Sequence, residues 1–214
     1  MLYFFQNPLQ LLYVLPAILI GLTVHEWAHA YAAYRLGDST ARNLGRMTLN
    51  PIAHIDPIGF LMLLLIGFGW ARPVPVNPRN FKNYRRDDIL VSLAGIGMNF
   101  VTAFLFSFIY VAGVLKWGLA TNEAFMNIFG SIITINLALA IFNLIPIYPL
   151  DGSHVLESLL VRKIPRFFMF LRQYGQWILL GLLLLGVVST VLGYLISGIS
   201  SGFFSVAAWF VNLF

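Results

Sequence analysis

Residues 9–36 read LQLLYVLPAILIGLTVHEWAHAYAAYRL, a long apolar run that carries ionisable side chains in its second half. The run is longer than the ~20 residues that a helix needs to cross a bilayer. A Gly-Asp-Ser turn at residues 37–39 follows it, and such residues commonly end helices. The sequence therefore predicts a membrane helix that holds His25, Glu26 and His29 within the apolar region.

The composition of the whole chain also indicates a membrane protein. Of its 214 residues, 59% are hydrophobic and only 10% are charged, and the mean hydropathy is +0.83. A soluble domain has about 25% charged residues, so this chain has too few charges to cover a surface in water. The absence of cysteine excludes disulfides, iron–sulfur clusters and thiolate-bound zinc, so a metal ion must be held by His, Asp or Glu.

Basic residues form three clusters, at 35–46, 72–86 and 162–172, whereas Lys116 stands alone between two apolar runs. Because cytoplasmic loops of membrane proteins collect Lys and Arg, we expect the clusters in the cytoplasm and Lys116 outside. Two clusters flank the apolar run 58–70, which is therefore expected to be re-entrant or part of a hairpin. Cytoplasmic Lys and Arg residues account for the net charge of +5. The aromatic residues do not interleave with the basic ones, so the sequence indicates no nucleic-acid partner.

Further apolar runs extend the membrane domain. We expect spanning helices over residues 88–115, 124–145 and 174–196. Residues 153–172 mix apolar side chains with basic ones, which predicts a helix at the membrane surface. The run 203–214 is apolar but shorter than a full span.

Residues 71–83 read ARPVPVNPRNFKN, and three prolines in this stretch forbid a continuous helix. An edge strand or a loop is expected there instead. The sequence as a whole predicts an all-α polytopic membrane protein with a single domain over residues 1–214. This domain is a bundle of roughly five to six transmembrane helices with a membrane-associated β-hairpin or loop near residues 71–83.

The motif HEWAH at residues 25–29 places two imidazoles four residues apart, on one face of a helix. Two imidazoles at this spacing can bind one zinc ion, and the glutamate between them can accept a proton from its water. The alternative is a chance pattern of packed polar residues, but ionisable residues inside membrane helices are costly and are usually functional. Arg35 follows His25 by ~15 Å along a helix, so we expect the site within the membrane, toward its cytoplasmic half.

A catalytic zinc ion usually has three protein ligands and an open position for water, so a third ligand must come from elsewhere in the chain. The candidates in apolar surroundings are His54, Asp151 and Glu157. Asp151 follows two prolines that end the preceding helix, and Gly152 permits a tight turn that can direct the carboxylate back into the bundle. Asp151 can equally be an ordinary capping residue of the next helix.

Five motifs follow one another along the chain, namely HEWAHA (25–30), TLNPIAHIDPIG (48–59), GWARPVPVNPRNF (69–81), SLAGIGMN (92–99) and NLIPIYPLDG (143–152). In this order they resemble the site-2 proteases, intramembrane zinc metalloproteases of peptidase family M50, in their short bacterial form without a PDZ or CBS module. The resemblance covers residues 18–160, and it implies a single intramembrane metalloprotease domain. Residues 153–214 would add a surface helix and a transmembrane segment.

The resemblance implies roles for several residues. It implies one zinc ion per chain, with Asp151 as the third ligand beside the two histidines of HEWAH and Glu26 as the general base. It implies that His54 lies near the active site as a hydrogen-bonding group, the alternative being a structural histidine. It also implies that Asn143 lines the site and binds the oxyanion or the substrate backbone, the alternative being a helix-end cap.

Gly95 and Asn99 match the Gly-x-x-x-Asn element of the family, in which the glycine allows two helices to pack closely. We interpret Asn99 as structural rather than catalytic. The family often has Ala-Gly-Pro where this chain has AGI at residues 94–96, a departure that concerns the helix bend rather than the metal site. Residues 73–78 resemble the loop that receives substrate as an added strand, the alternative being a plain connecting loop.

The function implied by the resemblance is cleavage of peptide bonds in or near transmembrane segments of other membrane proteins, in regulated intramembrane proteolysis. We expect a multi-pass plasma-membrane protein with its site toward the cytoplasm, and with the lipid bilayer and a transmembrane substrate as partners. Control then falls to a regulatory membrane partner or to gating between helices. Two alternatives are a zinc transporter, which needs a path of exchangeable sites, and an inactive scaffold, which needs no base such as Glu26.

Overall fold

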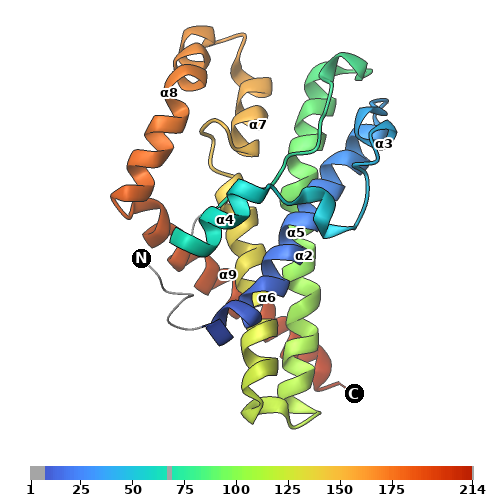
Figure 1. Ribbon diagram of the computed structural model, residues 1–214, viewed down its shortest axis with the longest axis vertical. Helices are drawn as coiled ribbons and strands as arrows, with labels where there is room; N and C mark the ends of the chain where they lie inside the picture. Colours follow the sequence, from blue (N-terminus) through green and yellow to red (C-terminus); the bar gives the residue numbers. More distant parts are fainter. Residues whose placement is uncertain (1–7, 67–68, 214) are drawn as a thin grey trace.

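The computed structural model describes residues 8–66 and 69–213. Within these ranges the protein is built from helices, and no β-strand is formed. The all-α polytopic fold predicted from the sequence is confirmed. Five helices are long and apolar enough to cross a membrane, namely α2 (Pro8–Arg35), α5 (Tyr84–Leu115), α6 (Glu123–Asn143), α8 (Pro165–Leu184) and α9 (Val187–Val211) (Figure 1).

Short helical segments connect these spans. One of them, α7, begins with Asp151. The segments are α3 (Thr40–Asn43), η1 (Pro51–His54), α4 (Pro57–Ile66), η2 (Pro78–Asn80), η3 (Leu119–Thr121) and α7 (Asp151–Leu160).

The core of the bundle is the packing of α2 against α5 and α6, while α9 packs against α5 and α6 as well. Small residues make up much of the buried face of α2, and Ala17 and Ala30 are completely buried. Small side chains allow helix backbones to approach closely in a membrane. Ala103 of α5 and Ile133 of α6 belong to one buried cluster, on which aromatic residues of α9 pack. This packing holds the HEWAH face of α2 against α5.

The two ends of the bundle differ in charge. α3 and the turn between α7 and α8 lie at one end, and the turn between α5 and α6 lies at the opposite end (Figure 1). The basic clusters 35–46 and 162–172 belong to the first end, and Lys116 belongs to the second. The fold therefore reproduces the charge asymmetry that the sequence predicts.

The run 58–70 folds back on itself and does not cross the bundle. Its helix, α4, has 10 residues, or ~15 Å, about half of a bilayer core. The chain then returns to its starting point, because a Cβ atom added at Gly69 would meet the Gly59 carbonyl group and would lie 2.7 Å from the Leu63 Cβ atom. This arrangement agrees with the re-entrant segment expected from the flanking basic clusters.

The boundaries predicted for residues 153–172 are wrong. This stretch is not one surface helix but is divided between α7 and the first part of α8. The division occurs before Pro165, which begins α8 because proline is well accommodated in the first turn of a helix and poorly in its interior.

The span predicted over residues 174–196 is also wrong. Its first part belongs to α8, which ends before Gly186, a residue in the left-handed region with a φ of 73°. α9 then continues to Val211, so the run 203–214 is mainly the end of this helix, and residue 214 lies outside the described residues.

Residues 71–77 are extended and lead into the short helix η2, and the described residues 71–83 form no β-hairpin. The sheet-like contact described for it is one isolated antiparallel bridge between Ile55 and Ala71. The three prolines remove backbone donors that a hairpin would need, which explains why the loop alternative is realised. We call residues 72–80 of this segment the strap.

Candidate metal centre

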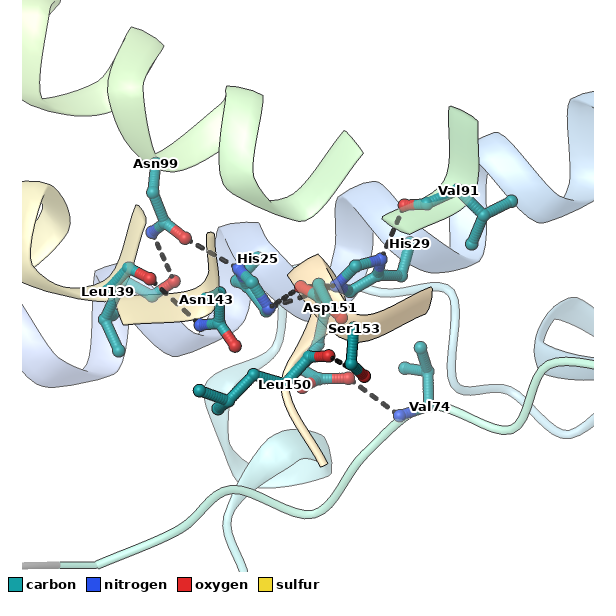
Figure 2. Close-up of polar contacts among 12 residues, drawn as sticks. His25, His29, Val74, Val91, Asn99, Leu139, Asn143, Leu150, Asp151 and Ser153 are labelled. Atoms are coloured by element: carbon teal, nitrogen blue, oxygen red, sulfur yellow. Dashed lines mark hydrogen bonds and ion pairs between the residues drawn. The ribbon is translucent and has the colours of Figure 1, made fainter. Parts of the chain in front are cut away.

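Three side chains from two distant parts of the chain meet inside the bundle. His25 and His29 project from one face of α2, and Asp151, the first residue of α7, lies opposite them (Figure 2). The Asp151 Oδ2 atom lies 3.2 Å from the Nε2 atom of each histidine, and the two Nε2 atoms are 3.0 Å apart. The structure therefore brings together the HEWAH histidines and one of the three candidates for the third ligand.

The turn before α7 directs the Asp151 carboxylate into the bundle. An added Cβ atom at Gly152 would lie 2.8 Å from the Ile145 carbonyl oxygen, so glycine is required for this close approach. The N-cap position of α7 is Leu150, and Ser153 donates a hydrogen bond to its carbonyl oxygen at 2.6 Å. Asp151 is thus not placed as the cap of α7, and its side chain faces the histidines instead.

Each histidine is oriented through its second ring nitrogen. The His29 Nδ1 atom lies 2.8 Å from the Val91 carbonyl oxygen, and the His25 Nδ1 atom lies 2.7 Å from Asn99 Oδ1 (Figure 2). Both partners are acceptors, so both Nδ1 atoms carry the proton. In the neutral form of each ring the Nε2 atom is then unprotonated, and it faces the Asp151 carboxylate.

Asn99 contacts a metal-binding histidine directly, in addition to its part in helix packing. Its Nδ2 group donates to the Gly21 carbonyl oxygen at 3.0 Å and to the Asn136 Oδ1 atom at 2.9 Å. These two bonds fix the amide so that its Oδ1 atom faces His25. The residue is completely buried, as is Asn136, and it therefore orients His25 through a hydrogen bond that the sequence did not predict.

The three facing atoms suit a bound cation. All three are electron-pair donors, and the Asp151 Oδ2 atom is buried without a hydrogen-bond partner. Such donors repel one another unless a positive charge lies between them. Their separations of 3.0–3.2 Å are close to the ~3.3 Å edge of a tetrahedron with ~2.0 Å ligand distances. Two imidazoles and one carboxylate are the ligands of a catalytic zinc site that keeps its fourth position open.

Gly95 brings α5 directly against the two imidazole rings. An added Cβ atom at this position would overlap with His29 Nε2 and would lie 2.8 Å from His25 Nδ1. The close helix packing expected of the Gly-x-x-x-Asn element is therefore packing against the metal-binding side chains themselves.

Glu26 and the three clustered residues open onto one cavity of about 350 Å³. Glu26 is 8% exposed, and its Oε2 atom accepts a hydrogen bond from the Val74 backbone N–H at 2.7 Å. Its Oε1 atom has no hydrogen bond to any residue that the structure describes. The strap forms one wall of the cavity through Pro73, Val74, Val76 and Pro78.

The other predicted site residues lie in different places. Asn143 lines the cavity, and its Nδ2 group donates one hydrogen bond to the Leu139 carbonyl oxygen at 2.9 Å. His54 is 1% exposed and is the last residue of η1, before α4, where its Nε2 atom is 2.8 Å from the Thr48 carbonyl oxygen. It is absent from the described lining of this cavity, and its Nδ1 atom is buried without a hydrogen-bond partner among the described residues.

Glu157, the remaining candidate for the third ligand, is turned away from the cluster. Its carboxylate pairs with the guanidinium group of Arg172 at 2.7 Å, which ties α7 to α8. The structure therefore offers Asp151 and not Glu157 to the histidines.

Two ionisable residues of the cavity were not singled out in the sequence. Asp88 and His154 both line it, and a hydrogen bond of 2.7 Å joins Ser158 Oγ to Asp88 Oδ2. His154 follows Asp151 by one helical turn, which places the two side chains on one face of α7. That spacing was the available signal for His154, whereas Asp88 is recognisable only from the packing of α5 against α7.

Two histidines on one turn of a membrane helix, a glutamate between them and a distant carboxylate define an integral-membrane metalloprotease. Comparison with known proteins agrees. The profile of peptidase family M50 matches residues 111–185, which include Asp151 but not the HEWAH motif.

Curated relatives extend this likeness over most of the chain. The "Putative zinc metalloprotease YwhC" of Bacillus subtilis is 46% identical over 161 residues, which cover 73% of each chain. The "Putative zinc metalloprotease Rip2" of Mycobacterium tuberculosis is 31% identical over 212 residues, which cover 94% of this chain and 73% of the relative. No solved structure gives a significant match. The chain therefore belongs to peptidase family M50, the family of the site-2 proteases, and is a zinc metalloprotease.

Replacing Gly95 by Ala should weaken zinc binding by about 10- to 100-fold, the range found when groups supporting metal ligands are disturbed. The added methyl group would displace both imidazoles. Zinc affinity is to be measured on the purified protein by competition with a chelator. The matched control is Gly97→Ala, because an added Cβ atom there meets nothing within 4 Å. Equal affinity in both variants would show that the contact with the rings does not matter.

Proposed function

We propose that the protein is an intramembrane endopeptidase that cuts the transmembrane segments of other membrane proteins. The observation that carries this proposal is the position of the Glu26 cavity, between helices that are long and apolar enough to cross a membrane. A zinc protease acting on soluble proteins would not need to bury its ligands in such a bundle, where ionisable groups are costly.

We place the site on the cytoplasmic side of the plasma membrane. The support for this orientation is the charge asymmetry of the bundle, because positively charged loops remain in the cytoplasm. His25 lies about ten residues, or ~15 Å, from Arg35 at the end of α2. The scissile bond would then lie within the membrane but nearer its cytoplasmic surface, from which water would enter the cavity.

Glu26 is the general base in the proposed reaction. Zinc held by the two histidines and Asp151 supplies Lewis acidity, which polarises a peptide carbonyl and makes water a stronger acid. The Val74 N–H holds the Oε2 atom of Glu26. The Oε1 atom can therefore take the proton of the attacking water and later deliver it to the leaving amine. Asn143 has a second N–H that it can donate to the oxyanion.

The strap is the proposed docking edge for the substrate. The Val76 N–H and the carbonyl oxygens of Val74 and Val76 make no hydrogen bond to any described residue. A substrate segment in extended form can pair with these groups as an added strand. A helical substrate cannot, because its backbone groups are already paired. The substrate helix must therefore unwind near the cut, and a regulatory membrane partner could control its access.

The test is cleavage of a synthetic single-span peptide by the purified protein in liposomes. We expect cleavage that a zinc chelator abolishes and added zinc restores. Introducing proline near the cut should raise the rate by up to about 100-fold, since proline destabilises a helix interior by ~3 kcal/mol. The same proline near the opposite leaflet serves as the control. Equal rates for both peptides would contradict unwinding as a requirement.

Two other results would point to the alternative functions. Zinc binding without cleavage of any peptide in a panel would favour a scaffold. Zinc flux into the liposomes would favour a transporter.

A further inference from the structure

Asp38 is a buried carboxylate that takes no direct part in the proposed reaction. It follows α2, and it is completely buried. It accepts hydrogen bonds from the Asn77 backbone N–H at 2.7 Å, from the Asn80 side chain at 2.7 Å and from the Thr40 backbone N–H at 3.1 Å. Burial raises the pKa of the Asp38 carboxyl, but the hydrogen bonds from Thr40, Asn77 and Asn80 outweigh it, and the pKa lies below its ordinary value. Asp38 is therefore an anion whose partners include the end of the strap.

The backbone beside Asp38 is shaped to receive the strap. Gly37 has a φ of 113°, which an L side chain rarely adopts, and an added Cβ atom there would lie 2.9 Å from the Asn80 carbonyl oxygen. The strap thus rests directly on the turn that ends α2, a few turns along this helix from Glu26.

Arg46 fixes the beginning of the strap in a similar way. Its Nη2 group donates to the Arg72 carbonyl oxygen at 2.8 Å and to the Pro73 carbonyl oxygen at 3.3 Å. Between the two anchors, the Val74 side chain is buried in a cluster with Ala30. The strap is therefore held at both ends and at its centre, although it has no regular secondary structure there.

The central backbone N–H of the strap contacts the catalytic carboxylate. Val74 donates its N–H to Glu26 Oε2 at 2.7 Å. Val74 lies between two prolines, whose fixed φ angles make this part of the strap stiff. We therefore expect a displacement at Asn77, only three residues away, to shift the Val74 N–H as well.

We propose that Asp38 is a positioning residue for Glu26, acting through the strap. By holding the Asn77 end, it keeps the Val74 N–H against one carboxylate oxygen and leaves the other directed at the substrate. The effect on turnover rests on the proposed function, whereas the anchoring of the strap does not.

Asp38→Asn tests the proposal with little change in volume. The new amide group places a donor where the strap already presents donors, so the anchor should open. We expect kcat on the liposome peptide to fall about 10- to 100-fold, the effect of losing one hydrogen bond to a charged group. KM should change by less than about threefold, and zinc content should stay at the wild-type level.

Asp87→Asn is the matched control. Asp87 is also completely buried, and it accepts a backbone N–H from Asn83 at 2.8 Å, but it serves the first turn of α5 and not the strap. We expect its kcat to stay within about twofold of wild type. A loss of zinc in Asp38→Asn, or an equal loss of kcat in both variants, would show a general structural role and overturn the proposal.

Hydrogen exchange of the strap amides gives a readout that does not depend on cleavage. Exchange should accelerate in Asp38→Asn, and also in Glu26→Ala, which removes the acceptor of the Val74 N–H, while α5 stays protected. Unchanged exchange in either variant, or faster exchange in Asp38→Asn with unchanged kcat, would overturn the proposal. If wild-type protein cuts no peptide, the proposed function fails, and the exchange data still decide whether Asp38 holds the strap against Glu26.

Discussion

Replacing Glu26 by Gln is expected to lower the rate of peptide cleavage by about two to four orders of magnitude, the usual contribution of a general base. Glutamine has nearly the same shape and can still accept the Val74 N–H bond through its carbonyl oxygen, but it cannot take up the proton of the attacking water. Because Glu26 is not among the clustered ligand residues, the variant should keep its zinc. Initial rates on the liposome peptide and zinc content by atomic absorption measure the two effects.

Glu123→Gln is the matched control, because it makes the same chemical change at the start of α6, at the end of the bundle opposite to the basic clusters. Its rate should equal that of wild type. A Glu26→Gln protein that cleaves within about tenfold of wild type would require another base. Loss of zinc from this variant would instead assign Glu26 a structural part in the metal centre.

The sequence was most informative where function depends on local geometry. Two histidines four residues apart must share a face once the helix is given, so HEWAH defined half of the site before any tertiary contact was known. The third ligand depends on how α7 returns to α2, and spacing alone left three candidates. The structure separates them physically, since Glu157 pairs with Arg172 and His54 contacts the Thr48 carbonyl oxygen, a few residues before it.

The sequence pattern could not predict contacts between segments that are distant along the chain. The Asn99–His25 bond joins residues 74 apart, and the Val74–Glu26 bond joins residues 48 apart. Asn99 was interpreted as a packing residue because a Gly-x-x-x-Asn spacing indicates which face packs, but not which side chain lies opposite. Asp38 read as an ordinary turn former, and nothing in its neighbourhood along the chain shows that the strap lies over it.

The predicted helix boundaries were wrong where the hydropathy of the sequence does not change. Residues on both sides of Gly186 are apolar, so the break between α8 and α9 leaves no dip in the pattern. The basic residues before Gly186 led to a second wrong boundary, because Arg172 was taken to lie in a helix at the membrane surface. Its ion pair with Glu157 lets it lie within α8 instead.

Replacing Asp151 by Ala should remove one of three protein ligands and thereby most of the bound zinc. Zinc binding free energies of ~10–16 kcal/mol shared among four ligands put one ligand at roughly 3 kcal/mol, or about a hundredfold or more in affinity. The loss of zinc affinity should be larger than in Gly95→Ala, because the Asp151 carboxylate also carries the negative charge that balances the cation. Zinc content of the detergent-purified protein, with wild type at about one ion per chain, measures it without any substrate.

Glu157→Ala provides the comparison that decides between carboxylates. It removes the same chemical group from the same short helix, α7, and disturbs only the pair with Arg172, so zinc should stay at the wild-type level. Zinc lost from Glu157→Ala and kept in Asp151→Ala would mean that α7 presents its other face to the histidines in the membrane. Zinc lost from Asp151→Ala alone ties the metal to the three atoms that face one another at 3.0–3.2 Å, since a cation that all three bind relieves their mutual repulsion.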